Sequence, residues 1–243
     1  MTFKFQVRIS VCALAVGILL LSSHVTLQGA IITASEDNFV LRSGTGPTTP
    51  QGTGNETTFT LKESNFLQTN ARIGYLKFDL SSIAESILNQ GVISFTSTGT
   101  ASTPYTLRAY VLNAGISGYD WTESTITYNN RPAFNNTSDP LVNLSSVTAV
   151  GVDINVALNT PSSTTHSFAF TNLENYRQVD DTMTFIVMIT DQDNGSPSFT
   201  FASSEHATAA IRPRLEITAV PEPTTLGLLG LGLAGGILWR RRR

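Results

Sequence analysis

The chain has 243 residues, and its 15 lysines and arginines against 18 aspartates and glutamates give a net charge of −3. Residues 31–220 alone hold 9 basic and 17 acidic residues, a net charge of −8, which disfavours duplex DNA and anionic membranes as partners. Serine and threonine together number 57 and lysine only 3, a composition poor in helix formers that favours an all-β domain. The single cysteine, Cys12, lies in a segment that we expect to be removed, so the mature chain lacks disulfides and thiolate metal sites.

The first 30 residues have the pattern of a secretory signal peptide. Lys4 and Arg8 precede an apolar run at residues 11–21, which has the length of a signal-peptide hydrophobic region and is too short to span about 30 Å of hydrocarbon. We therefore predict a signal peptide at residues 1–30, with a retained N-terminal anchor as the alternative.

The C-terminal segment, residues 220–243, combines a Pro-Glu-Pro tripeptide, a glycine-rich apolar stretch at 226–239 and a terminal arginine cluster. The residues that define it are Pro221, Glu222, Pro223, Arg240, Arg241, Arg242 and Arg243. As a helix, the apolar stretch would rise about 21 Å, so it is a weak membrane anchor. The arginines favour a cytoplasmic end, which leaves everything before them outside the membrane.

This segment resembles the PEP-CTERM sorting signal of Gram-negative bacteria. The resemblance implies that a membrane-embedded exosortase recognises the Pro-Glu-Pro, cuts the chain and releases it to the cell envelope or the extracellular matrix. The hydrophobic helix would then contact the membrane only transiently. A simple C-terminal membrane tail is the alternative.

Residues 31–219 show the short alternating runs that are typical of a β-sandwich or barrel, and we count about ten strands. The clearest run predicts two faces, with Val150, Val152, Ile154 and Val156 on one and Gly151, Asp153 and Asn155 on the other. One short helix is predicted at residues 82–89, where Ser82 and Glu85 form a capping box.

Three passages in this domain resemble the DNRLRE domain, which is assigned to carbohydrate-binding module family 96. They are RIGYLKFDLSSI at 72–83, YDWTESTITYNNRPA at 119–133 and FTFASSEHATAAIRPRLEIT at 199–218. The resemblance covers most of residues 35–219 and implies that the all-β domain is a jelly-roll β-sandwich. Ser204-Glu205 stands where an Arg-Glu pair is common, so any ion pair or ligand contact of that arginine is missing here.

The sequence does not predict an enzyme. His166 and His206 lie far apart, and no nucleophile or phosphate-binding motif accompanies them. Carboxylates cluster at several places, Glu36-Asp37 and Asp120 with Glu123 among them, but a glycosidase needs two that face each other across a sugar bond. We interpret these clusters as solvated loop residues, with a lyase or hydrolase as the least favoured alternative.

The candidate metal ligands are Asp191 and Asp193. With Asn194 and Gly195 they form an oxygen-rich loop that would suit calcium, the one cofactor considered. The residue order of an EF-hand is not kept, so an ordinary hairpin turn is the favoured interpretation. Asp37 is a weaker candidate.

The candidate carbohydrate-binding residues follow from strand alternation. Around residues 75–80 and 107–111 the apolar side chains are predicted to face the core, which leaves an outward set on one open sheet face: Tyr75, Lys77, Arg108 and Tyr110. Aromatic rings cover apolar sugar C–H surfaces, and cations pair with uronate carboxylates. Alginate-binding members of the family imply a uronic-acid-containing polysaccharide, whereas the charge of −8 and an ordinary solvated face argue against it. Trp121 is interpreted as a core or loop-anchoring residue rather than a sugar platform.

Together these patterns predict a secreted, non-enzymatic domain that binds polysaccharide in the envelope or extracellular matrix of a Gram-negative bacterium. Its partners would be a polysaccharide and an exosortase-type processing enzyme. The alternative is a structural matrix or biofilm protein that binds no glycan.

Overall fold

The computed structural model describes residues 29–42, 48–52, 56–63, 70–83, 89–133, 142–192 and 198–218. All of them belong to one compact unit, Gly29–Val220. The predicted signal peptide and C-terminal sorting segment lie outside the described residues. Most of the predicted helix at 82–89 lies outside them as well, and its described residues, Ser82, Ile83 and Asn89, lie in turns or bends. Within the described ranges, no helix is long and apolar enough to cross a membrane.

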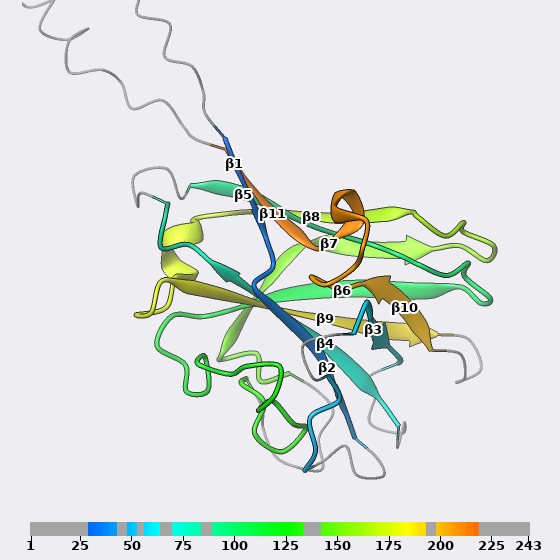
Figure 1. Cartoon of the computed structure of the whole chain (residues 1–243), viewed down its shortest axis with the longest axis horizontal. Coiled ribbons are helices and arrows are strands. Elements are labelled where there is room, and N and C mark those ends of the chain that lie inside the picture. The colour runs from blue at the N-terminus through cyan, green and yellow to red at the C-terminus, as the bar shows by residue number, and fades with distance from the viewer. Residues whose placement is uncertain are drawn as a thin grey trace, which may run out of the picture. The chain divides into compact units, whose positions relative to one another are not determined.

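The predicted all-β sandwich is confirmed, with eleven antiparallel strands in the described part of the chain (Figure 1). One sheet has four strands in the order β1 (Ala30–Thr33), β11 (Arg214–Thr218), β5 (Gln90–Thr96) and β8 (Thr165–Thr171). A second has five strands in the order β2 (Glu36–Leu41), β4 (Arg72–Asp79), β9 (Thr182–Gln192), β6 (Tyr105–Leu112) and β7 (Val147–Val156). A small third sheet pairs β10 (Phe199–Ala202) with β3 (Thr58–Leu61), and two short 3₁₀ helices are η2 (Leu173–Tyr176) and η3 (Ala209–Ile211).

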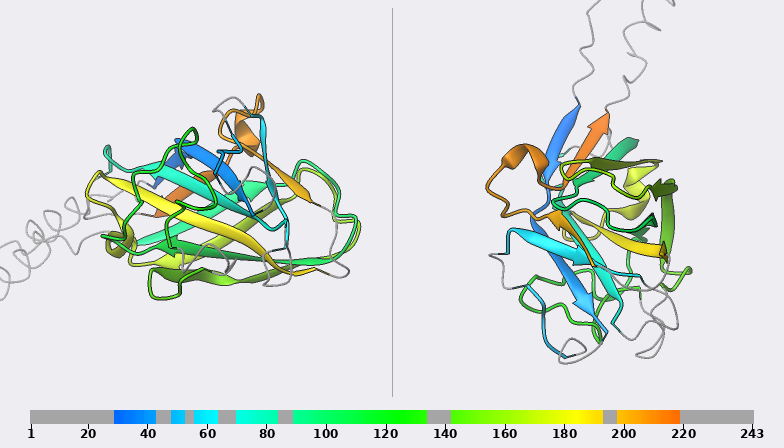
Figure 2. Two further views of the ribbon diagram at one scale, coloured as in Figure 1. Left: turned by 90° about the horizontal axis from the view of Figure 1, so that it is seen from below. Right: turned by 90° about the vertical axis from the view of Figure 1, so that its right-hand side faces the viewer.

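The two large sheets form two layers around the main hydrophobic core (Figure 2). The predicted inward phase of the strands is confirmed, because Leu76, Phe78 and Leu107 are fully buried between the sheets. The ring of Phe78 meets that of Phe185 edge-on at 5.6 Å, and Phe95 of the facing sheet belongs to the same core. Burying each such side chain stabilises the fold by about 1.5–3 kcal/mol, so this alternation decides which face of every strand points inward.

The predicted alternation of β7 is only partly right. Val150 and Val156 are buried as expected and Ile154 is half-buried, but Val152 is 82% exposed. The register against β6 shifts at this point, since Leu107 pairs with Ile154 while Ala109 pairs with Val150. The additional residues form a bulge that begins at Gly151, whose φ of 64° favours glycine, and the bulge carries Val152 out of the core.

A second hydrophobic cluster covers the opposite face of the five-stranded sheet. Residues 113–133, which follow β6, fold back over this face as a covering segment and contribute Trp121, Ile126 and Tyr128, which pack on Tyr75 of β4 and Tyr110 of β6. Both faces of the five-stranded sheet are therefore buried over much of their area, one by the other sheet and one by this covering segment. The arrangement decides where a ligand can reach the molecule.

Candidate functional site

The four residues predicted to bind carbohydrate do share one sheet face. Tyr75 and Tyr110 both stand opposite Ile186 of β9, Lys77 stands opposite Thr184, and Arg108 stands opposite Met188. The expectation that the whole set is exposed is wrong, because the exposed fraction is 1% for Tyr75, 5% for Lys77 and 8% for Tyr110. Strand alternation gave the correct face, but the covering segment lies on it.

Lys77 is a structural residue of this covered face. Its ammonium group donates a hydrogen bond to the carbonyl oxygen of Trp121 and lies 4.8 Å from the centre of the Trp121 ring. Burial lowers the pKa of Lys77, and the nearby Glu36 carboxylate partly opposes that change. The cation thus holds the covering segment down, and it is not available to a uronate.

Arg108 is the one member of the set that keeps contact with solvent. Its Nε donates a hydrogen bond to Oδ1 of Asp153 at 2.8 Å, and its Nη2 bonds the other oxygen of the same carboxylate. This pairing raises the pKa of Arg108 and lowers that of Asp153. A bidentate pair neutralises the guanidinium, so an anionic ligand would have to displace an existing partner.

The polar residues at 119–133 form hydrogen bonds within this passage, which accounts for the residue types found there. The side-chain oxygen of Asn130 accepts from the backbone N–H of Thr127 at 2.6 Å, and its amide donates to the carbonyl of Thr125 at 2.8 Å. Trp121 is 5% exposed and donates from its indole nitrogen to Oγ1 of Thr184 at 3.1 Å. The structure therefore confirms the interpretation of Trp121 as an anchoring residue.

Of the two predicted metal ligands, only Asp191 lies among the described residues, so the predicted calcium site stays a prediction. Asp191 belongs to β9, where its backbone pairs with Thr106 of β6, and Asp193 lies outside the described residues.

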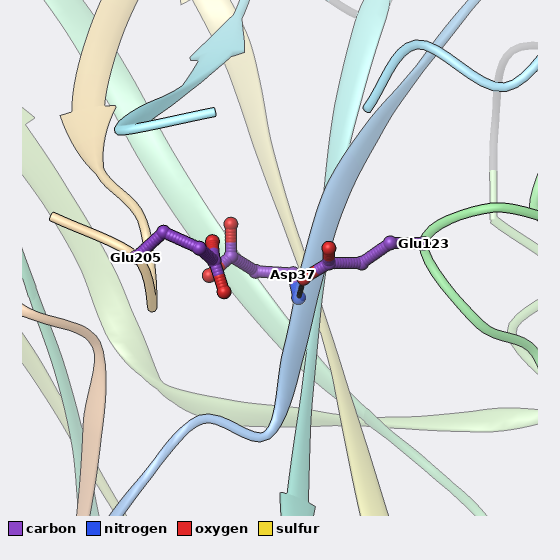
Figure 3. Close-up of side chains that lie close together, drawn as sticks. All are labelled: Asp37, Glu123 and Glu205. Atoms are coloured by element: carbon purple, nitrogen blue, oxygen red, sulfur yellow. Dashed lines mark hydrogen bonds between the residues drawn. The ribbon is translucent and has the colours of Figure 1, made fainter. Parts of the chain in front are cut away.

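A different set of carboxylates does converge, from three distant segments (Figure 3). Asp37 comes from β2, Glu123 from the covering segment and Glu205 from the loop after β10, and one oxygen of each lies within 4.8 Å of the others. The backbone N–H of Asp37 donates to Glu123 Oε1 at 2.8 Å, and Ser204 Oγ donates to Glu205 at 2.5 Å. The cluster is nearly closed to solvent, since Asp37 is 5% and Glu123 7% exposed.

Burial dominates the electrostatics of this cluster. It raises the pKa of Asp37 to about 7, with the neighbouring charges of Glu205 and Glu123 acting in the same direction. The pKa of Glu123 is likewise raised to about 7 by burial, and Glu205 and Glu36 add to the effect. Like charges held this close in a low-dielectric site favour retained protons or a hard cation such as Ca²⁺, which takes oxygen ligands of this kind. In the sequence, Glu36-Asp37 and Glu123 are separate acidic positions, and no local pattern places Glu205 beside them.

A groove with a volume of about 500 Å³ lies at one end of the four-stranded sheet. Its described lining comes from four strands and η2, and consists of Gln90, Gly91, Val92, Thr148, Ala149, Gly151, Ala169, Phe170, Thr171, Tyr176 and Thr218. None of these side chains is charged. No sequence pattern predicts the groove, because its lining residues become neighbours only through the register of the strands.

Two family profiles match the chain. That of carbohydrate-binding module family 96 matches residues 29–180, and the PEP-CTERM protein-sorting motif matches residues 219–243. No curated protein gives a significant match.

Solved structures similar to the chain include three from infectious bursal disease virus. They are the T13 viral particle (12% identity, TM-score 0.26, 81% of this chain), the Gx strain (10%, 0.24, 82%) and the VP2 subviral particle (10%, 0.24, 82%). This chain spans 40%, 37% and 42% of their respective lengths. At these TM-scores the likeness gives no basis for assigning a function.

Proposed function

Since the chain belongs to carbohydrate-binding module family 96, we propose that it binds polysaccharide at a bacterial surface without modifying it. The match over residues 29–180 is the observation that carries this proposal, because it covers most of the sandwich. The PEP-CTERM motif at residues 219–243 supports delivery to the cell surface.

The carboxyl cluster supports a binding role over a hydrolytic one. A glycosidase needs two carboxyl groups on opposite sides of a sugar bond, with room for the substrate between them. Asp37, Glu123 and Glu205 lie within 4.8 Å of one another, and two of the three are nearly inaccessible. A sugar ring has no access to the space between them.

We further infer that the sandwich is a jelly roll. Its strands pair as a rolled-up hairpin would: β1 pairs with β11, β4 with β9, β5 with β8 and β6 with β7. This nested order divided between two sheets is the pattern of the double Greek key.

We propose that an exosortase-type enzyme cuts the chain near Pro221–Pro223 and releases it to the envelope or extracellular matrix of a Gram-negative bacterium. The last strand, β11, ends at Thr218, so the motif at 219–243 begins directly where the described fold ends. Intact-mass analysis of protein released by an exosortase-containing host should show a chain that lacks residues 226–243. Recovery of released protein with these residues attached would contradict the proposed processing.

Glycan binding is tested on the compact unit, residues 29–220. The purified unit is applied to a panel of polysaccharides with calcium or EDTA, and products are checked for new reducing ends. Binding without product release is the expected result. Absence of binding across the panel would favour the alternative, a structural matrix or biofilm protein, and released sugar would show an enzyme.

A further inference from the structure

We propose that the groove at the end of the four-stranded sheet binds the polysaccharide, and that its ligand is a chain of uncharged sugars. The inference rests on the proposed glycan-binding function and adds the location of the site and the class of ligand. It moves the site away from the covered face that contains Tyr75 and Lys77.

A row of polar side chains crosses three strands at the groove. Gln90 of β5 stands directly opposite Thr171 of β8 and also opposite Thr218 of β11. All three residues are exposed, and residues paired in this way point to the same face of a sheet. Neighbouring strands lie about 4.8 Å apart, so the row offers hydroxyl and amide groups at regular intervals to the hydroxyls of a sugar chain.

Apolar surface lies beside the polar row. Val92 and Ala169 form the next cross-strand pair on the same face, and both have small side chains. Phe170 and Tyr176 also line the groove, but both rings are half-buried and pack against the main core. The aliphatic side chains of Val92 and Ala169 would cover the apolar C–H faces of pyranose rings, while the polar row meets their hydroxyls.

The β7 wall of the groove depends on a glycine. At Gly151 the chain has a φ of 64°, and a Cβ atom there would lie 3.3 Å from the carbonyl oxygen of Ala169. The missing side chain lets β7 lie close against β8. The volume of about 500 Å³ is within the roughly 300–1,000 Å³ of small-molecule pockets.

The charge of the groove selects the ligand class. No described lining residue is charged, and Glu216, which stands opposite Val92 beside the groove, is paired with Arg214 at 2.9 Å. A uronate carboxylate entering this site would lose hydration without gaining a cation. The net charge of −8 over residues 31–220 would also repel a polyanion.

The test measures binding of the 29–220 unit to two sets of ligands at low and high salt. The neutral set consists of gluco-, xylo-, manno- and galacto-oligosaccharides, and the anionic set of alginate and polygalacturonate oligomers. We expect binding within the neutral set, with an affinity that changes little with salt, because no ion pair is screened.

Variants locate the site. Gln90→Ala and Thr171→Ala should each weaken binding about five- to tenfold, the effect of one lost hydrogen bond. Ala169→Trp should obstruct the groove and weaken binding further. Thr165→Ala, on the same strand outside the described lining, and Ala157→Trp, in the exposed loop after β7, are the matched controls and should bind as the parent does. Thermal unfolding of every variant verifies that it is folded.

The possible failures are distinguishable. If the parent unit binds neither set, the proposed function itself fails. If the parent unit binds but the groove variants bind as tightly as their controls, the assignment of the site to the groove is wrong, while glycan binding itself is supported. If it binds only alginate or polygalacturonate, with an affinity that falls at high salt, the assignment to uncharged sugars is overturned.

Discussion

The buried carboxyl cluster makes the stability of the sandwich depend on pH. The pKa of Asp37 is raised by burial from 3.8 to about 7 in the folded chain. Between these two values the folded chain binds more protons than the unfolded chain, so the free energy of unfolding decreases as the pH rises. The destabilisation is absent below about pH 4 and fully present above about pH 7.

Its magnitude follows from the size of the shift. One pKa unit corresponds to about 1.4 kcal/mol, so Asp37 alone destabilises the fold at neutral pH by up to about 4 kcal/mol. The value is an upper limit, because Glu123 has a pKa raised to about 7 in the same cluster and the two groups titrate as a pair.

Asp37→Asn removes the charge and keeps an oxygen that can accept the hydrogen bond from the backbone N–H of Ser204. We expect the variant to be more stable than the parent at pH 7.5 by a few kcal/mol and to lose most of that advantage at pH 4.5. Urea unfolding at several pH values, with EDTA present so that no cation neutralises the cluster, measures the difference. The exposed Glu174→Gln on η2 is the control for the replacement of a carboxyl group by an amide. An Asp37→Asn effect that is constant over this pH range, or that grows toward acid, would refute the reasoning.

Five further substitutions test the packing. Lys77→Ala should lower the free energy of unfolding by about 2–3 kcal/mol, because it removes a hydrogen bond from a charged group under the covering segment. Arg108→Ala, at the exposed ion pair, should lower it by less than about 1 kcal/mol. Equal losses for the two variants in urea unfolding would contradict this assignment. Phe78→Ala should cost about 3–5 kcal/mol, and a loss below 1 kcal/mol would show that the core is assigned incorrectly. At Gly115 the φ is 76° and nothing lies within 4 Å of an added Cβ atom, so Gly115→Ala should lower the free energy of unfolding by about 1 kcal/mol through backbone strain alone. Gly151→Ala should lower it by more, because its Cβ atom would also contact Ala169. Equal losses for the two variants would show that β7 and β8 do not approach closely at Gly151.

Local patterns predicted the fold well because strand alternation is a local property. Leu76, Phe78 and Leu107 face the core as expected, since period-two hydrophobicity reports directly on burial. The exception, Val152, lies in a bulge that depends on the register against β6, and register is not visible within one strand. Strand alternation therefore predicts burial reliably only where the pairing with the neighbouring strand is regular.

The candidate site was harder to predict because alternation tells which face a residue occupies but not what covers that face. Tyr75 and Tyr110 are on one face as predicted, yet the covering segment seals that face. The interpretation of Trp121 as an anchoring residue already implied that some surface of the domain is covered, because an anchoring tryptophan needs a surface to pack on. The carboxyl cluster and the groove depend on contacts between segments that are far apart in the sequence, and a single sequence does not reveal such contacts.

Tryptophan fluorescence can report which sheet face binds the ligand. The chain has two tryptophans, Trp121 and Trp239. Only Trp121 lies in the 29–220 unit, where it is 5% exposed and its ring centre is 6.0 Å from that of Tyr75. The groove is lined by three strands of the four-stranded sheet, by Tyr176 and by β7 at the edge of the five-stranded sheet, and no tryptophan is among its described residues. Alternate residues of β8 are exposed, so a glycan can reach this sheet without moving the covering segment. Saturating the unit with a bound oligosaccharide should therefore leave the Trp121 emission maximum unchanged. A ligand that used the face of Tyr75 and Lys77 would have to lift the covering segment, which would expose Trp121 and shift its emission to longer wavelength. Such a shift would place the binding site on the covered face of the five-stranded sheet and not in the groove.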